Sequence, residues 1–321
     1  MTRPSAVPPP VTAVLDASSR WLPARLGEVE ELLRGSIDGY GETVGADAAA
    51  TLAAGGKRMR PMLVLLCAGA EGGPAAVRAG AAVELIHMAT LVHDDVLDDA
   101  PLRRGLPTVA ASAGRGRAVA TGDLLLSRAF ALLADAGDTR AVSLLSTASV
   151  ALARGELAQR QDAYDAGISE ARYLERCRLK TAKLFECACR LGRDDPTLGE
   201  FGAEIGLAFQ LLDDVLDVAG PPERTGKARG TDLLDGTVTL PLIEAIRAEP
   251  ALAGVDLRAL DADAAAALCD RIAATGALDR VRARALEMVA AAKRRLDAGA
   301  FEPEQARLLH LVADGVVQRY S

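Results

Sequence analysis

Apolar residues recur along most of this chain with the three- and four-residue spacing of an α-helix. That spacing places them on one helix face, and no run of strictly alternating apolar and polar residues predicts a strand. Glycine and proline mark the breaks, as at Gly55-Gly56 and Asp195-Pro196. Apart from a helical region from Val11 to about Gly35, the expected helices span 37–52, 62–70, 75–98, 118–134, 139–163, 169–191, 196–218, 240–248, 262–273, 279–298 and 303–317.

The segments between these helices have the composition of loops. Residues 101–116 are rich in Arg and Gly, and residues 219–236 in Gly and Pro. The Pro-rich segment 1–10 is expected to be disordered or extended. Residues 11–321 are therefore expected to form one all-α domain, a large helical bundle.

Composition and charge narrow the function classes. An aromatic content of 3% favours helix over sheet, and a net charge of −7 argues against a general nucleic-acid-binding protein. The five cysteines form no CxxC pair or zinc spacing, which indicates small core residues in a reducing cytoplasm. No uninterrupted run of about 18 apolar residues predicts a transmembrane segment, and the N-terminus lacks the pattern of a signal peptide.

Two acidic clusters interrupt helices that are otherwise apolar. One such cluster alone is usually a solvated helix face, but two copies of DDxxD in apolar helices bury charge that needs a partner. Carboxylates at i and i+4 share a helix face, and oxygen-only ligands suit Mg²⁺. Two helices that face each other across a central cavity would use both clusters together. The acids are Asp94, Asp95, Asp98, Asp213, Asp214 and Asp217.

Basic residues gather at the breaks between these helices. Arg suits bidentate capture of phosphate and Lys acts as a mobile point charge. Each one alone could be a solvated loop residue, and His87 could be a core histidine or a diphosphate contact. No P-loop, Rossmann glycine motif or Ser-His-acid set is present, so the expected ligand is a diphosphate that serves as substrate and leaving group. The cations are Lys57, Arg60, Arg103, Arg104, Lys180, Lys183 and Lys227.

Five motifs occur in an order and spacing that resemble those of the trans-isoprenyl diphosphate synthases, or polyprenyl synthetase family, and especially its long-chain members. The resemblance runs from about Gly55 to Arg319. The motifs are GGKRMRP at 55–61, ELIHMATLVHDDVLDDAPLRRGLPT at 84–108, KTAKLF at 180–185, FQLLDDVLD at 209–217 and GKARGTDLLDGTVTLP at 226–241.

The resemblance implies an all-α fold with a deep central cavity, usually in a homodimer. A long product is expected to be released at a membrane surface. It implies head-to-tail condensation of isopentenyl diphosphate onto an allylic diphosphate. It also implies three Mg²⁺ ions per site, held by Asp94, Asp98 and Asp213, with Asp95, Asp214 and Asp217 nearby.

The resemblance also implies roles for individual residues. The residues expected to bind isopentenyl diphosphate are Lys57, Arg60, His87 and Arg104. The residues expected to bind the allylic diphosphate are Arg103, Lys180 and Lys227. Thr181 and Gln210 would direct oxygen dipoles at the allylic cation. Many members carry Lys where this chain has Thr237, which puts one auxiliary phosphate contact in doubt.

Product length depends on the helix before Asp94, which is expected to form a cavity wall. Ala89 and Thr90 are small, so they leave the cavity open below the reacting carbon. The helix rises about 1.5 Å per residue, which gives this wall the depth for several isoprene units. The product is therefore expected to exceed four isoprene units and to reach about six to ten. A neighbouring helix could still close the cavity. The alternatives are a short-chain synthase that makes farnesyl or geranylgeranyl diphosphate, a terpene cyclase, and a non-catalytic partner subunit of a heteromeric synthase.

Overall fold

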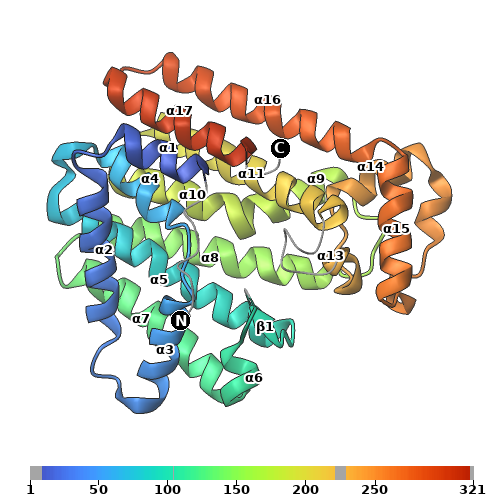
Figure 1. Ribbon diagram of the computed structural model, residues 1–321, viewed down its shortest axis with the longest axis horizontal. Coiled ribbons are helices and arrows are strands. Elements are labelled where there is room, and N and C mark those ends of the chain that lie inside the picture. Colours follow the sequence, from blue (N-terminus) through green and yellow to red (C-terminus); the bar gives the residue numbers. More distant parts are fainter. Residues whose placement is uncertain (1–8, 104, 221–228, 319–321) are drawn as a thin grey trace.

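The computed structural model describes residues 9–103, 105–220 and 229–318, and this part of the chain is almost entirely helical, which confirms the all-α prediction (Figure 1). The α-helices are α1 (Pro9–Ala17), α2 (Leu22–Ile37), α3 (Ala46–Ala53), α4 (Met59–Ala68), α5 (Gly73–Leu97), α6 (Val109–Ala113), α7 (Arg115–Ala134), α8 (Thr139–Gln161), α9 (Glu170–Cys177), α10 (Lys183–Gly192), α11 (Pro196–Ala219), α13 (Thr231–Leu234), α14 (Leu240–Ala248), α15 (Ala262–Ala274), α16 (Ala277–Asp297) and α17 (Pro303–Gln318).

Helices α5 and α11, which carry the acidic clusters, run through the interior with α8 and α10 beside them (Figure 1). Helix α5 packs mainly against α7 and α4, and α11 against α16 and α10. By length and hydropathy α5 and the turn before it (70–97) would pass for a membrane span, but 72% of its apolar window is buried inside the protein. It therefore has the burial expected of a core helix.

The ends of these two helices follow local sequence signals. Each has Pro at its first turn, where no backbone N–H is needed. The Asp195 side chain caps α11 by accepting from the backbone N–H groups of Thr197 and Leu198, at 2.8 and 3.3 Å. The backbone N–H of Asp98 donates to the Asp94 carbonyl at 2.8 Å, so the first acidic cluster forms the last turn of α5.

Two expected helical regions are interrupted in the structure. The N-terminal region divides into α1 and α2 at residues 18–21, and α1 begins at Pro9, two residues before the expected start at Val11. The expected helix 169–191 contains a π-helical turn, η3 (Arg178–Ala182), between α9 and α10. Such π turns are frequent at functional sites, and η3 carries Lys180 and Thr181.

The expected loop 101–116 contains regular structure that the sequence analysis missed. Strands β1 (Leu102–Arg103) and β2 (Leu106–Pro107) pair antiparallel, and α6 follows. The side chain of Thr108 caps α6 by accepting from Ala111 N–H at 3.1 Å and donates to the Ala100 carbonyl at 2.7 Å. Similarly, the expected loop 219–236 contains α13. All four elements are too short for a periodic pattern to reveal them.

The remaining irregular elements are short turns of helix. The expected helix 37–52 is wrong at its start, because α2 continues to Ile37 and a π-helical turn precedes α3. These elements are η1 (Gly41–Gly45), η2 (Ala70–Gly72), η4 (Pro250–Gly254) and η5 (Leu257–Ala259).

Candidate functional site

A polar cavity of about 220 Å³ opens between the C-terminal end of α5, α8, η3 and α11. Acids of both clusters reach it, together with basic side chains and with hydroxyl and amide groups. The residues that line it are Asp94, Asp98, Arg103, Gln159, Arg160, Ala163, Tyr173, Arg176, Cys177, Lys180, Thr181, Gln210, Asp214, Asp232, Asp235, Thr237 and Thr239. The two acidic helices thus share one cavity, as their chemistry predicts.

In the first cluster, Asp94 and Asp98 face the cavity, as their i and i+4 spacing predicts. Burial raises the pKa of Asp94 to about 6, although the positive charge of Lys180 opposes the shift. Asp95 is buried and accepts a hydrogen bond from Nε of Arg103 at 2.7 Å, and its ion pair with Nη2 of the same guanidinium is also 2.7 Å long. Asp95 therefore orients Arg103, which itself lines the cavity.

In the second cluster, Asp214 is the acid that reaches the cavity. Its Oδ2 accepts from the Tyr173 hydroxyl at 2.5 Å and its Oδ1 from the Gln210 amide at 2.8 Å. Burial, with the charge of Asp232, raises the pKa of Asp214 to about 8. Asp217 accepts from the backbone N–H of Asp232 at 3.2 Å, and this bond joins α11 to α13.

A chain of hydrogen bonds fixes the amide of Gln210. The hydroxyl of Thr181 donates to Gln210 Oε1 at 2.7 Å, while Gln210 Nε2 donates to Asp214. The amide oxygen is therefore held beside Thr181 and the amide nitrogen beside the carboxylate. Two neutral oxygen dipoles thus lie at the cavity wall, where they can stabilise a positive charge.

The basic wall of the cavity comes from η3 and α8. The ammonium of Lys180 donates to Glu156, which also accepts from Arg160 at 3.0 Å. Burial lowers the pKa of Lys180, but the charges of Asp94 and Glu156 outweigh this effect and raise it. Lys180 therefore remains a cation at neutral pH, although it is largely surrounded by protein.

Lys57 in the loop before α4 and Arg60 in the first turn of α4 are two of the residues predicted for isopentenyl diphosphate. Arg60 lies with its guanidinium 4.7 Å from the centre of the Phe185 ring, and its Nε is buried without a hydrogen-bond partner. Burial lowers the pKa of Arg60 to about 10, although the charges of Glu84 and Asp213 oppose this shift. A buried, unsatisfied guanidinium N–H is a ready donor for an anionic ligand.

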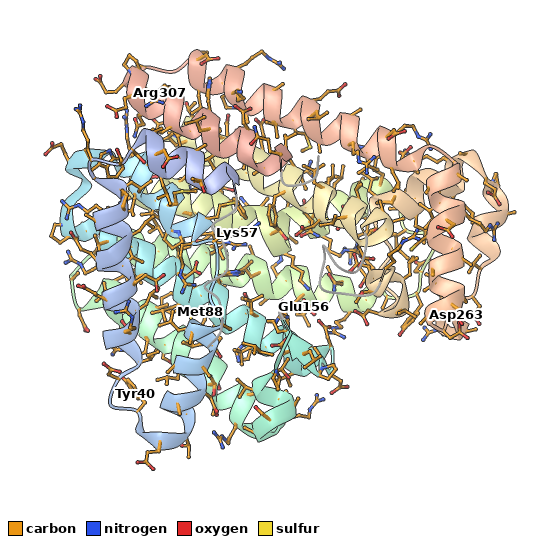
Figure 2. All side chains as sticks on the ribbon, viewed as in Figure 1. Tyr40, Lys57, Met88, Glu156, Asp263 and Arg307 are labelled. Carbon is orange, nitrogen blue, oxygen red and sulfur yellow. The ribbon has the colours of Figure 1, made fainter. Side chains whose placement is uncertain are left out.

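Arg58 holds this loop in place. Its backbone is left-handed, with φ of 47°, and its guanidinium donates to Glu30 on α2 and to Glu84 on α5, the latter at 2.8 Å. In the view of Figure 2, Lys57 from this loop and Glu156 from α8 both lie towards the middle of the molecule. Arg58 thus joins the loop to two helices, with Lys57 and Arg60 on either side of it in sequence.

The structure brings together around the cavity only some of the residues predicted for the site. Arg104 and Lys227 lie outside the described residues. The predicted residues that line the cavity are Asp94, Asp98, Arg103, Lys180, Thr181, Gln210 and Asp214. The predicted residues that do not line it are Lys57, Arg60, His87, Ala89, Thr90, Asp95, Asp213 and Asp217.

The donor set suits a hard cation. Within residues 9–103, 105–220 and 229–318, no three His, Cys, Asp or Glu side chains lie close enough together to form a complete metal site. Mg²⁺ needs no such group, because it usually binds one or two carboxylates and completes its shell with water and phosphate. Asp94 and Asp98 from α5 and Asp214 from α11 meet that requirement from two sides of one cavity.

Several residues at the site were not predicted from the sequence, among them Glu156, Arg160 and Tyr173. Glu156 and Arg160 are four residues apart on α8, which is the spacing of an intrahelical ion pair and was a usable signal. Tyr173 gave no such signal. Its role depends on α9 packing beside α11, and this contact between distant segments cannot be derived from local spacing.

Comparison with known proteins gives consistent similarities. The polyprenyl synthetase family model matches residues 43–267. Heptaprenyl diphosphate synthase component 2 of Geobacillus stearothermophilus is 39% identical over 83% of this chain and 87% of its own length. Octaprenyl diphosphate synthase of Escherichia coli is 39% identical over 60% of this chain, and the match spans 62%, less than two thirds, of the E. coli protein.

Solved structures share the fold over nearly the whole chain. A decaprenyl diphosphate synthase from Rhodobacter capsulatus superposes with a TM-score of 0.87 and 32% identity, covering 97% of this chain and 99% of that one. A polyprenyl synthase from Caulobacter crescentus CB15, complexed with calcium and isoprenyl diphosphate, gives 0.89 and 33%, covering 97% and 98%.

Proposed function

Because this chain belongs to the polyprenyl synthetase family, whose members are trans-polyprenyl diphosphate synthases, we propose that it condenses isopentenyl diphosphate head-to-tail onto an allylic diphosphate. The observation that carries the proposal is the shared cavity, where Asp94 and Asp214 from two helices meet Lys180. Its preferred primer would be farnesyl or geranylgeranyl diphosphate and its product a long all-trans polyprenyl diphosphate.

The residues that line the cavity have different roles in the proposed reaction. As the allylic C–O bond breaks, its electron pair moves to the diphosphate oxygen, and Arg103 and Lys180 stabilise the charge that develops there. The oxygens of Thr181 and Gln210 face the allylic cation. The isopentenyl double bond then attacks the allylic carbon, and loss of a proton forms the new double bond.

Three Mg²⁺ ions are the expected cofactor. Asp94, Asp98 and Asp214 line the cavity and would hold them, with Asp213 and Asp217 next along α11. Bound Mg²⁺ would supply positive charge that binds and activates the diphosphate leaving group. Two of the acids form ion pairs with arginines, Asp98 with Arg160 and Asp95 with Arg103. These ion pairs compensate part of the negative charge of the acidic cluster.

Isopentenyl diphosphate is expected on the side of the α4 loop. Arg60, in the first turn of α4, has an unsatisfied buried Nε, and the other residues expected there are Lys57 in the preceding loop and His87 on α5. The charge of Asp213 acts on Arg60, so the first turn of α4 is directed towards the second acidic cluster. Both substrates would then approach α11 from opposite sides.

The product is proposed to be long because small residues precede Asp94 on α5. From Asp94 to Ala82 the helix extends about 18 Å, with Ala89 and Thr90 in its upper turns. Relatives differ in product, since they include a heptaprenyl diphosphate synthase component and a geranylgeranyl diphosphate synthase. A short-chain product is therefore the alternative.

We also propose a homodimer in the cytoplasm, with release of the long product at a membrane surface. Val150 and Leu157 on α8 are 59% and 62% exposed and lie seven residues apart, so they share one helix face. Burial of such a face against a second copy would remove apolar area from water. The molar mass in solution, measured by light scattering, tests this proposal.

The condensation itself is tested with the purified chain, Mg²⁺, labelled isopentenyl diphosphate and each allylic primer. We expect extended products, and we expect Asp98→Asn to lower kcat at least tenfold. Asp99→Asn is the matched control, because Asp99 is 80% exposed beside Arg115 and does not line the cavity. Lack of condensation with every primer would contradict the proposal for the chain alone.

One relative is called component 2 of its synthase, which favours a second candidate, a subunit that needs a partner. All six acids are present in this chain, which supports activity of its own. Condensation by the homogeneous protein would decide for an independent enzyme, and activity only after addition of another subunit would decide for a heteromer.

A further inference from the structure

Arg160 on α8 is an arginine that the proposed reaction does not yet use. It lines the same cavity as Arg103 and Lys180. Its Nη2 donates to Asp98 at 2.5 Å and its Nε to Glu156 at 3.0 Å. We propose that Arg160 is a further binding residue for the allylic diphosphate, an inference that rests on the function proposed above.

The exposure of the cavity arginines distinguishes Arg160 from the others. The side chain of Arg160 is 41% exposed, that of Arg103 is 32% exposed, and that of Arg176 is 3% exposed. Arg176 is also committed to Asp162 and to the carbonyl of Val238. Arg160 is therefore the arginine of this wall whose donors are most accessible to a ligand.

Glu156 fixes the position of the Arg160 guanidinium. Its Oε1 accepts from Arg160 and its Oε2 from Lys180, so one carboxylate holds two cations on the same wall. An arginine fixed through Nε keeps its two terminal nitrogens in a planar fork, which matches the oxygens of a phosphate. The pair Arg160 and Lys180 thus forms a preorganised site for one diphosphate end.

Asp98 is the exchangeable partner of Arg160. Asp98 is exposed at the end of α5, and its carboxylate is one of those proposed to bind Mg²⁺. When Asp98 turns to another cation, Nη2 of Arg160 loses its acceptor while the bond from Nε to Glu156 remains. An oxygen of the allylic diphosphate then takes the place of Asp98 as the acceptor.

The test compares binding of farnesyl S-thiolodiphosphate, an unreactive allylic analogue, by calorimetry at saturating Mg²⁺. Loss of one charge-assisted hydrogen bond at a partly exposed site is expected to weaken binding by Arg160→Gln about tenfold. Arg160→Lys keeps the charge without the fork and should recover part of the affinity. The KM for isopentenyl diphosphate should stay within about twofold of the wild-type value, because its site lies elsewhere.

Arg178→Gln is the matched control. Arg178 is 51% exposed near Lys180, contacts Glu175 only at 4.0 Å, and does not line the cavity. Thermal melting of each variant separates loss of fold from loss of binding, and Arg160→Lys keeps a cation beside Glu156. Equal affinity of wild type and Arg160→Gln overturns the role of Arg160. Failure of the wild-type protein to bind the analogue overturns the proposed function as well.

Substrate-free protein gives a second readout. Because Arg160 competes for Asp98, Arg160→Gln should bind Mg²⁺ more tightly than the wild-type protein when no diphosphate is present. Tighter metal binding together with weaker analogue binding distinguishes a diphosphate ligand from a residue that only supports the fold. Weaker Mg²⁺ binding by the variant would contradict the exchange at Asp98.

Discussion

Replacing Gly155 by alanine tests how closely the position of Lys180 is set by helix packing. Gly155 lies on α8 where α8 crosses η3, and an added Cβ would lie 2.5 Å from the backbone nitrogen of Lys180 and 2.8 Å from its Cα. Ordinary contacts begin near 3.4 Å. The two elements must therefore separate by about 0.9 Å, and backbone atoms cannot rotate away as a flexible side chain can.

This displacement should reduce activity more than stability. Overpacking of this kind costs about 1–3 kcal/mol of folding free energy, which leaves a protein of this size folded. A shift of about 1 Å in a group that contacts the reacting diphosphate can lower the rate up to about 100-fold. We therefore expect kcat to fall about 10- to 100-fold at saturating substrates, with a decrease in melting temperature of a few degrees.

The matched control is Gly27→Ala on α2. Gly27 is exposed and helical, and nothing lies within 4 Å of the added Cβ, so stability should rise by about 0.5–1 kcal/mol with kcat unchanged. Melting curves and initial rates of both variants complete the assay. A Gly155→Ala protein that melts lower but keeps wild-type kcat would refute the claim that the position of Lys180 limits the reaction.

Three further predictions follow from the site. The pKa values of Asp94 and Asp214 are raised to about 6 and about 8, so these groups stabilise the metal-free fold at low pH and this contribution is lost as the pH rises through those values. Mg²⁺ should therefore raise the melting temperature more at about pH 8.5 than at about pH 5.5. Equal increases at the two pH values would contradict this prediction. Arg58→Lys loses the guanidinium that donates to both Glu30 and Glu84 and holds the loop before α4. The KM for isopentenyl diphosphate should therefore rise several-fold while the KM for the allylic substrate stays constant. A rise in the allylic KM alone would count against this prediction. Ala89→Phe, about 7.5 Å along α5 from Asp94, should shorten the product in mass spectra, and an unchanged product would disprove the wall assignment.

The long helices could be predicted because each combines a periodic apolar face with a clear start. Helix α11 begins at Pro196, directly after its cap Asp195, and α14 spans the predicted residues 240–248. The short elements β1, β2, α6 and α13 could not be predicted, because they contain too few residues to display a period. The π turn at Arg178–Ala182 also leaves no signature in the sequence, although it carries two of the predicted site residues.

The site could be predicted because apolar helices cannot bury unpaired acidic side chains. This reasoning placed the two acidic clusters at one cavity, and Asp94 and Asp214 both line it. Which acid of each cluster faces that cavity depends on helix rotation against neighbours. Asp214 faces it, whereas Asp213, the residue implied by the resemblance, does not line it. Tyr173 and Arg160 join the site through contacts between segments far apart in sequence, and these contacts exist only in the packed structure.

Both acidic clusters are proposed to hold metal around one allylic diphosphate. A crystal structure of the protein with Mn²⁺, as an anomalous substitute for Mg²⁺, and farnesyl S-thiolodiphosphate tests this proposal most directly. We predict metal peaks between the diphosphate and Asp94 and Asp98 on one side, and between the diphosphate and the acids of α11 on the other. Metal bound by only one cluster, or a diphosphate held outside the cavity, would contradict the account.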